Sequence, residues 1–155
     1  MVDVIEQIIV NKSRDLVFLL AQDYDLRLDW DPFLKDISFV SENNDLARGL
    51  QVWVKAHNNM EMTVEYTNYK YPEHVSMKMI NGPFIFKKFS GLWQFDEIDD
   101  QTTCVLFKYS ITPILILKPG SLIIKWILSR DMRKRLKALK ESIESGEFDE
   151  ELMNI

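Results

Sequence analysis

Hydrophobic and polar residues alternate along most of the first 113 positions, which is the spacing of β-strands with one buried face. The pattern is clearest from Met60 to Tyr69, where Met60, Met62, Val64 and Tyr66 are separated by polar residues. The other predicted strands are Val2 to Val10, Asp36 to Ser41, Leu50 to Ala56, Val75 to Met79, Phe84 to Phe95 and Cys104 to Ile111. The pattern therefore predicts a sheet of about seven strands.

Turn-forming residues separate neighbouring strands, since Asn, Asp, Gly and Pro favour the dihedral angles of tight turns. The predicted turns are Asn43-Asn44-Asp45, His57-Asn58-Asn59, Tyr71-Pro72-Glu73, Asn81-Gly82-Pro83 and Asp99-Asp100-Gln101. Because these connections are short, successive strands must run antiparallel. We therefore expect the strands that follow Asp36 to form an antiparallel meander.

Three segments have helical spacing instead. Ser13 can cap a first short helix, and a second covers Tyr24 to Leu28 and ends before Pro32, because the residue preceding a proline avoids helical dihedrals. A long helix runs from Ser121 to about Ser145, and Gly146 stops it. Its predicted core-facing stripe is Leu122, Trp126, Met132, Leu136, Leu139 and Ile143.

The order of elements is one strand, two helices, six strands and a long helix. Neither a single amphipathic helix nor a half-polar sheet can bury its apolar face alone, so each must cover the other. We expect an α+β fold in which a curved antiparallel sheet wraps around the C-terminal helix and the two short helices plug one end. Residues 1–146 are predicted to form a single domain, and residues 147–155 an acidic, disordered tail.

Composition is that of an ordinary globular domain, with 46% hydrophobic and 28% charged residues. The 155 residues can bury a core without disulfides or metals, and the single cysteine, Cys104, excludes an internal disulfide. This cysteine usage suits a reducing cytosol, so we expect a cytoplasmic protein. The N-terminus has acids where a secretion signal would have bases, and no apolar run approaches the ~20 residues that span a bilayer.

Charge is unevenly distributed around a net value of −5, which argues against a general nucleic-acid binder. Eight bases and one acid, Asp131, lie between residues 118 and 140. The bases are Lys118, Lys125, Arg130, Arg133, Lys134, Arg135, Lys137 and Lys140. A solvated helix face explains this run, and a basic face for anionic lipid or RNA is the alternative.

Residues 114–128 contain ten apolar side chains, more than one helix face needs. Burial beneath the connector that precedes the helix is one interpretation of this excess. The other is contact with a membrane surface or with a second subunit in a homodimer, with Lys118 and Lys125 beside the apolar residues.

Three sets of residues, in this order and spacing, resemble a known family. They are Trp30-Asp31-Pro32-Phe33, then Gly82-Pro83-Phe84 with Gly91-Leu92-Trp93-Gln94-Phe95 and Thr102-Thr103, and last Arg130-Asp131-Met132 with Leu136 and Leu139. The chain is similar from Val4 to about Glu144 to the helix-grip superfamily of START-like and Bet v 1-like (SRPBCC) domains. Within this superfamily the chain most resembles the polyketide cyclase/dehydrase and coenzyme Q-binding families. The resemblance implies a cavity between sheet and helix that binds apolar or polycyclic molecules.

The inward faces of the predicted elements identify the residues that would line such a cavity. These are Val54, Met62, Val64, Tyr66, Met77, Met79, Trp93, Phe107 and Tyr109 from the sheet, and Trp126 and Met132 from the long helix. Trp30 and Phe33 lie where similar folds have the mouth of the pocket. Methionine side chains are flexible and suit walls that adapt to irregular apolar ligands. The alternative is that the same residues fill a close-packed core, with Trp30 and Phe33 as a hydrophobic plug.

The sequence therefore favours binding of a hydrophobic small molecule such as a lipid, an isoprenoid quinone or a polycyclic aromatic, with its transport as a further role. A cyclase or dehydratase of the polyketide type is the alternative, and a Tyr, Asp or Glu with a shifted pKa inside the cavity would favour it. A third hypothesis, from ribosome-associating members of the group, is contact between RNA and the basic helix face.

Residues suited to catalysis are few, and we predict neither a catalytic residue nor a cofactor. His57 and His74 are far apart in the meander and have no partner at metal-ligand spacing. Cys104 has no recognisable base beside it. Glu61 and Glu65 share a strand face that should point to solvent.

Overall fold

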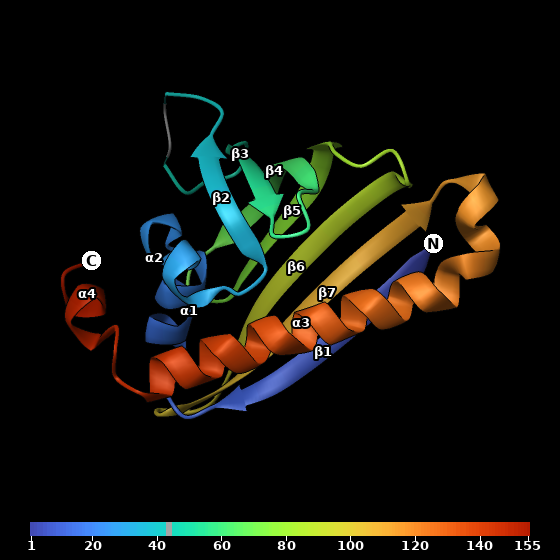
Figure 1. Ribbon diagram of the computed structural model, residues 1–155. Coiled ribbons are helices and arrows are strands. Elements are labelled where there is room, and N and C mark those ends of the chain that lie inside the picture. Colours follow the sequence, from blue (N-terminus) through green and yellow to red (C-terminus); the bar gives the residue numbers. More distant parts are fainter. Residues whose placement is uncertain (43–44) are drawn as a thin grey trace.

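A single antiparallel sheet of seven strands, in the order β1-β7-β6-β5-β4-β3-β2, forms the larger layer of the part of the chain that the structure describes (Figure 1). The structure is a computed structural model that describes residues 1–42 and 45–155. The first two positions of the turn predicted at Asn43-Asn44-Asp45 lie outside the described residues. The strands are β1 (Val2–Val10), β2 (Leu34–Phe39), β3 (Gln51–Ala56), β4 (Glu61–Lys70), β5 (His74–Asn81), β6 (Phe86–Asp99) and β7 (Thr102–Pro113). From β2 to β7 each strand pairs with the next, which confirms the predicted meander.

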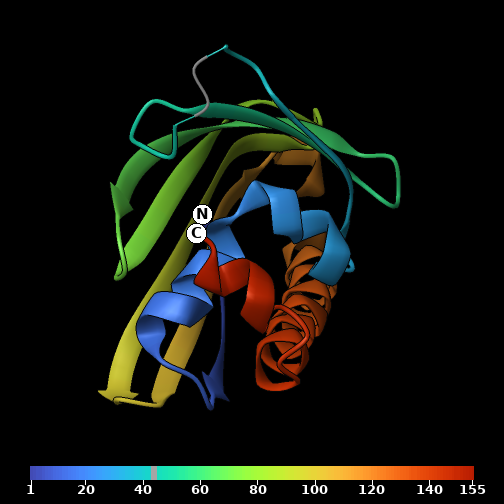
Figure 2. The same ribbon diagram turned by 90° about the vertical axis from the view of Figure 1, so that its left-hand side faces the viewer.

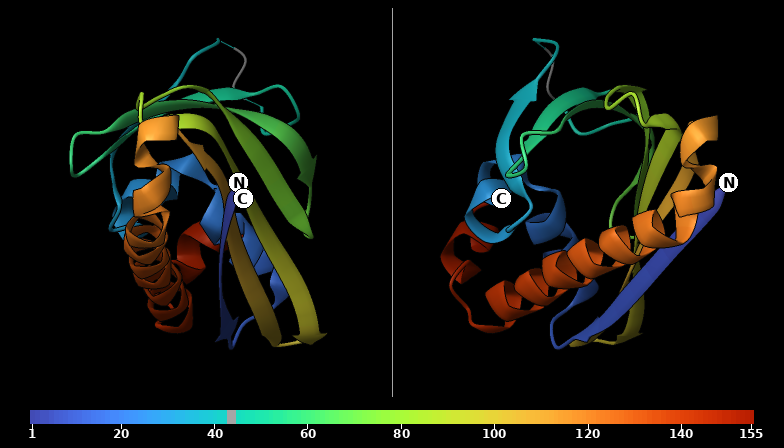
Figure 3. Two further views of the ribbon diagram at one scale, coloured as in Figure 1. Left: turned by 90° about the vertical axis from the view of Figure 1, so that its right-hand side faces the viewer. Right: turned by 45° about the vertical axis from the view of Figure 1, so that its right-hand side comes forward.

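The sheet is strongly curved, so that β2 to β5 bend over the other elements (Figures 2 and 3). β6 and β7 are 14 and 12 residues long and pair from Phe86 opposite Pro113 to Asp99 opposite Thr102. Register shifts in the pairing of β4 with β5 mark bulges, which increase the local twist. Because side chains alternate along each strand, half of them point into the concave side of this sheet.

Helices occupy the concave side (Figure 2). α1 (Arg14–Gln22) and α2 (Tyr24–Trp30) follow β1, while η1 (Leu115–Gly120) and α3 (Ser121–Glu144) follow β7. α3 runs along β1 beneath the bend of the sheet (Figures 1 and 3). The predicted α+β arrangement, with short helices after the first strand and a long C-terminal helix gripped by the sheet, is confirmed.

Aromatic contacts fix α1 against the sheet and close one end of the fold. The ring of Phe18 on α1 lies 5.0 Å from the ring of Phe95, between centroids, and 5.5 Å from that of Tyr69. Phe18, Val17 and Leu20 are fully buried. Edge-on aromatic pairs of this kind stabilise a packed core beyond their burial alone.

The apolar stripe predicted for α3 is correct only in its C-terminal half. Met132, with Leu136, Leu139 and Ile143, is buried, but Leu122 is 82% exposed and Trp126 is 58% exposed. At 3.6 residues per turn, Leu122 and Trp126 lie to one side of Met132 around the helix, and Ile124, Ile127 and Leu128 lie to the other. The inward face of the first half of α3 is therefore formed by Ile124, Ile127 and Leu128, not by Leu122 and Trp126.

The prediction of a disordered tail at residues 147–155 is wrong. These residues contain α4 (Asp149–Met153), which lies beside α1 (Figure 2). Phe148 and Leu152, four positions apart, are 5% and 4% exposed and belong to the main core. Gly146, at φ +77°, turns the chain after α3 in a conformation that glycine adopts without strain. The prediction was based on the acidic residues of this segment and overlooked that Phe148 and Leu152 lie on one face of a short helix.

Candidate functional site

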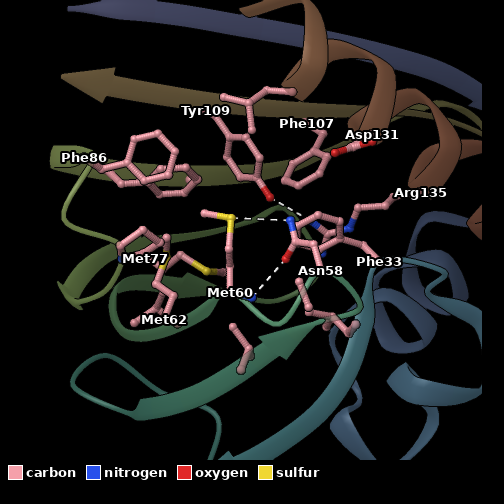
Figure 4. A pocket seen from close by; sticks show the side chains of 18 of the residues that line it. Phe33, Asn58, Met60, Met62, Met77, Phe86, Phe107, Tyr109, Asp131 and Arg135 are labelled. Carbon is pink, nitrogen blue, oxygen red and sulfur yellow. Dashed lines mark hydrogen bonds between the residues drawn. The ribbon is translucent and has the colours of Figure 1, made fainter. Parts of the chain in front are cut away.

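A cavity of about 390 Å³ lies between the concave face of the sheet and α3. Strands β2 to β7 contribute its wall together with α2, α3 and the loop before β6. The predicted wall residues that line it are Phe33, Val54, Met62, Val64, Met77, Trp93, Phe107 and Tyr109. Figure 4 shows Met62, Met77 and Phe86 at one side of this cavity and Phe33 with Arg135 at the other.

The other predicted wall residues lie elsewhere, and they are Trp30, Tyr66, Met79, Trp126 and Met132. Trp30 is buried beneath α1, where its indole Nε1 donates to the backbone carbonyl of Leu20 at 3.0 Å. It is the hydrophobic plug that the sequence left as an alternative. Met132 belongs to the core, Met79 is half-buried near Gly82, and Trp126 is exposed beside Arg130.

Several lining residues were not anticipated. Most of the apolar ones come from two segments: Pro83, Ile85, Phe86 and Phe89 around the start of β6, and Ile124, Ile127 and Leu128 on α3. The others are Leu34, Ala56 and Met60. A helical count backward from Met132 in steps of four reaches Leu128 and Ile124, so the sequence did contain this signal. The unanticipated polar residues are Tyr24, Arg27, Asn58, Asp131 and Arg135.

Asp31 is the centre of a buried charged cluster at one end of the cavity. It is 2% exposed. Arg27 donates to it from Nε at 2.8 Å, and Arg135 donates from Nη2 at 2.9 Å and from Nε at 3.2 Å. The backbone N–H of Phe33 donates to the same carboxylate at 3.0 Å. Asp31 thereby ties α2 to α3, elements that are far apart in the sequence.

Both kinds of charge in this cluster are retained at neutral pH. Burial alone would raise the pKa of Asp31, but the guanidinium groups of Arg135 and Arg27 outweigh burial and hold that pKa below its ordinary value. Burial alone would lower the pKa of Arg135, but Asp31 more than offsets it, and the pKa is raised. Asp31 and Arg135 are therefore a true ion pair inside the fold.

Each of the two guanidinium groups lies close to two aromatic rings. Arg27 lies over Trp30 and Trp93, at 5.1 Å and 5.3 Å from the ring centroids. Arg135 lies over Phe33 and Phe107, at 4.9 Å and 5.0 Å. Cation–π contacts of this kind are strongest where water is excluded, so they help to hold both cations beside the cavity.

Tyrosine hydroxyls complete the polar end. Arg135 Nη1 donates to the hydroxyl of Tyr109 at 2.6 Å, and the hydroxyls of Tyr24 and Tyr66 share a hydrogen bond of 2.5 Å. Figure 4 shows the Tyr109 hydroxyl directed toward Arg135. Burial raises the pKa of each of these phenols, so all of them stay protonated at neutral pH. As neutral phenols they can donate hydrogen bonds, but the raised pKa also makes them weaker acids than an exposed tyrosine.

The C-terminal part of the basic run on α3, from Arg133 to Lys140, is not a free cationic face. Arg135 is 5% exposed and pairs with Asp31, so its predicted place on the RNA-contacting face is wrong. Arg133, Lys137 and Lys140 lie within 3.9, 3.8 and 2.8 Å of carboxylates of the same protein. A sequence cannot distinguish a buried base from a solvated one when both occur in the same charged stretch.

Other reactive residues lie away from this cavity. Burial, with Asp96 nearby, raises the pKa of Cys104, which disfavours the nucleophilic thiolate. His74 hydrogen-bonds Asn68 at 2.9 Å. Within the described ranges, no group of three or more His, Cys, Asp or Glu could hold a metal ion. None of the described helices is long and apolar enough to cross a lipid bilayer.

Comparison with known proteins identifies a family and several similar structures. The family model described as polyketide cyclase / dehydrase and lipid transport matches residues 1–144. A search of curated proteins found no match.

Similar solved structures include the Zhui aromatase/cyclase from Streptomyces sp. R1128, which is 15% identical with a TM-score of 0.79 over 94% of each chain. A START superfamily protein from Mycobacterium smegmatis is 14% identical with a TM-score of 0.78, over 92% of this chain and 97% of the other. The di-domain ARO/CYC BexL of the BE-7585A biosynthetic pathway is 19% identical with a TM-score of 0.76, over 93% of this chain and 47% of BexL. At these identities the likenesses confirm the START-like fold.

Proposed function

Since the chain belongs to the polyketide cyclase / dehydrase and lipid transport family, we propose that it binds a hydrophobic small molecule in the cavity between the sheet and α3. The observation that supports this most directly is the cavity itself, about 390 Å³ in volume and apolar except at the Asp31 end. Close-packed cores leave few voids larger than a water molecule. A cavity of this size is therefore not expected from ordinary core packing, and it supports a binding role.

The wall suits an apolar occupant of variable shape. Ligand cavities usually measure about 300–1,000 Å³ and are lined by apolar and aromatic side chains with a few polar groups, and this cavity fits that description. Met60, Met62 and Met77 contribute flexible thioethers to the wall. Burial of apolar surface at roughly 25 cal/mol per Å² supplies the binding free energy. Lipids, isoprenoid quinones and polycyclic aromatics are the candidate classes, and transport of such a molecule is the corresponding role.

A neutral fluorescent probe, N-phenyl-1-naphthylamine, tests this proposal. We expect the protein to bind the probe and to enhance its fluorescence emission. Met77→Trp places a larger side chain in the cavity and should weaken binding by about tenfold or more. Met153→Trp is the matched control, because Met153 is exposed on α4. Equal binding by the Met77→Trp variant would show that the pocket wall is wrongly assigned. If the wild type neither binds the probe nor carries a ligand detectable by native mass spectrometry from its own host, the proposed function is wrong.

Polyketide cyclisation or dehydration is the second candidate, favoured by the Tyr109–Arg135 pair. The Tyr109 hydroxyl, kept protonated by burial, can donate to a carbonyl oxygen of a chain held in the cavity, and Asp131 places a carboxylate in the same wall. The rate would come mostly from orientation of a flexible chain. Mass spectrometry of a poly-β-keto thioester incubated with the protein tests this role. We expect a cyclised or dehydrated product, reduced about 100-fold or more by Tyr109→Phe. A product profile unchanged by the wild-type protein would exclude this role.

A further inference from the structure

The Asp31 carboxylate at the polar end of the cavity is already occupied by donors of the protein itself. Oδ1 of Asp31 accepts from the backbone N–H of Phe33 at 3.0 Å and from Arg135 Nε at 3.2 Å. Oδ2 accepts from Arg27 at 2.8 Å and from Arg135 Nη2 at 2.9 Å. A ligand that needs an acceptor from the protein therefore finds none on Asp31.

Donors at the same end are in excess. The Tyr109 oxygen accepts from Arg135, so its own hydrogen has no acceptor among the described residues. Only one hydrogen can lie between the hydroxyls of Tyr24 and Tyr66, which leaves the other without an acceptor in the described part of the chain. Arg27 uses Nε toward Asp31 and Nη1 toward the carbonyl of Ala21. Tyr24, Arg27, Tyr109 and Arg135 all line the cavity.

Net charge at this end is positive. Two guanidinium groups face one carboxylate, Asp31, and all three are almost fully buried. The other carboxylate in the wall, Asp131, lies 3.7 Å from Arg130 on its own helix. An excess charge buried beside an apolar space is unfavourable unless a counter-charge is supplied. A ligand with a negative group would supply it.

We propose, on the premise of the proposed function, that the ligand is an amphipathic acid. Its apolar body lies against the methionine and phenylalanine wall. Its carboxylate, or a similar oxyanion, accepts from Tyr109 and the guanidinium edges of Arg27 and Arg135. Raised phenol pKa values at this end are consistent with this role, because they keep Tyr24 and Tyr109 as donors at neutral pH.

Three amphiphiles of equal chain length test the inference: dodecanoate, dodecanol and dodecylamine, each as a competitor of N-phenyl-1-naphthylamine. We expect dodecanoate to compete about tenfold more strongly than dodecanol, and dodecylamine to be the weakest, because a hydrogen bond to a charged group is stronger than one to a neutral group. Tyr109→Phe should weaken dodecanoate about tenfold and change dodecanol much less. Tyr71→Phe, at an exposed tyrosine outside the cavity, is the control.

Each outcome decides between the two proposals. If the probe binds but the three head groups compete equally, or if none competes, the amphipathic acid is wrong while the proposed function stands. If dodecanoate is preferred but Tyr109→Phe leaves that preference intact in a folded protein, the assigned polar end is wrong. If the wild type binds neither the probe nor any of the three amphiphiles, both proposals fail.

A different observation supports a second inference, about the outer surface near the same cavity. The η1 surface is a group of large apolar side chains that are more than half exposed: Phe84, Leu115, Ile116, Leu122, Ile123 and Trp126. The segments that carry them are joined by a hydrogen bond of 3.0 Å from the backbone N–H of Ile114 to the carbonyl of Ile85. Pro83, Ile85, Ile124 and Ile127 from the same two segments line the cavity. The η1 surface therefore borders the cavity.

Charge on the η1 surface has the opposite sign to that of the whole chain. Residues 114–130 contain Lys118, Lys125 and Arg130 and no acid, and residues 82–90 add Lys87 and Lys88, again without an acid. The net charge of the protein is −5. An exposed apolar surface rimmed by cations is complementary to a bilayer with anionic head groups.

We infer that the protein binds peripherally to anionic membranes through the η1 surface. Flotation with vesicles tests this. We expect binding to phosphatidylcholine mixed with phosphatidylserine, little binding to phosphatidylcholine alone, and release at high salt. Leu122→Glu should weaken binding about tenfold or more. Ile98→Glu is the control, because Ile98 is an exposed apolar residue at the far end of β6. Absence of vesicle binding, or an equal effect of both variants, would contradict the inference. So would a concentration-dependent dimer that Leu122→Glu dissolves, because a second copy would then cover the surface.

Discussion

Asp31 joins several elements of the fold, although no sequence pattern around it indicates this role. Its carboxylate accepts from side chains of α2 and α3 and from the backbone of Phe33, and it holds both guanidinium groups at the cavity. A buried ion pair adds little over an apolar replacement, but removal of one partner leaves an uncompensated charge. Here two cations would lose their common partner.

Replacement of this carboxylate should therefore be strongly destabilising. We expect Asp31→Asn to lower the free energy of unfolding by about 3–5 kcal/mol, because Arg27 and Arg135 remain buried without a counter-charge. Urea denaturation measures the change. Asp29→Asn, at an exposed residue of α2, should stay within about 0.5 kcal/mol of wild type. Similar effects of the two substitutions would contradict the importance of the buried cluster.

Stability should also depend on pH through Asp31. Its pKa is below the ordinary value of 3.8 in the folded protein, so the unfolded state binds protons first as pH falls. The stabilisation is fully present above the unfolded pKa and is lost as pH falls through the folded pKa. We expect the difference in unfolding free energy between wild type and Asp31→Asn to shrink below about pH 4. Denaturation curves at several acidic pH values measure it, and a constant difference would count against the ion pair.

At the scale of elements, the sequence identified the strands and the long helix better than their ends. Alternation located residues such as Met62 and Met77 on the inward face, because side chains along a strand have a period of two. Helical spacing failed for Trp126, since α3 is uncovered at its start and its inward face there follows Ile124 and Leu128. The period of a helix or strand shows which side chains share a face. Which of those faces is buried depends on the element that packs against it.

α4 offers a test of an element that composition concealed. We expect Leu152→Ala to lower the free energy of unfolding by about 2–4 kcal/mol, because Leu152 is buried in the main core. Met153→Ala, next to it and exposed, should change stability by less than about 0.5 kcal/mol. Urea denaturation distinguishes them. Equal stability of the two variants would mean that the tail is frayed, as its acidic composition suggests.

For the molecule as a whole, the cavity makes stability and ligand binding depend on each other. A molecule that occupies the cavity only in the folded state stabilises the protein by about 2.7 kcal/mol at 100 times its Kd. We expect N-phenyl-1-naphthylamine at saturating concentration to raise the Tm of wild type, and to raise that of Met77→Trp much less. Differential scanning calorimetry measures both shifts. An unchanged Tm of the wild type at saturation would contradict binding inside the fold.

The amino-acid sequence by itself determined the order of the elements, the antiparallel meander, and part of the apolar wall. These follow from local rules, namely the periods of strands and helices, turn chemistry, and the need of one amphipathic layer to cover another. The tertiary structure alone decided the polar end of the cavity. Asp31 and Arg135 are 104 positions apart, and nothing local distinguishes this arginine from the solvated bases around it. Their meeting depends on the bend of the sheet over α3, which brings α2 and α3 together.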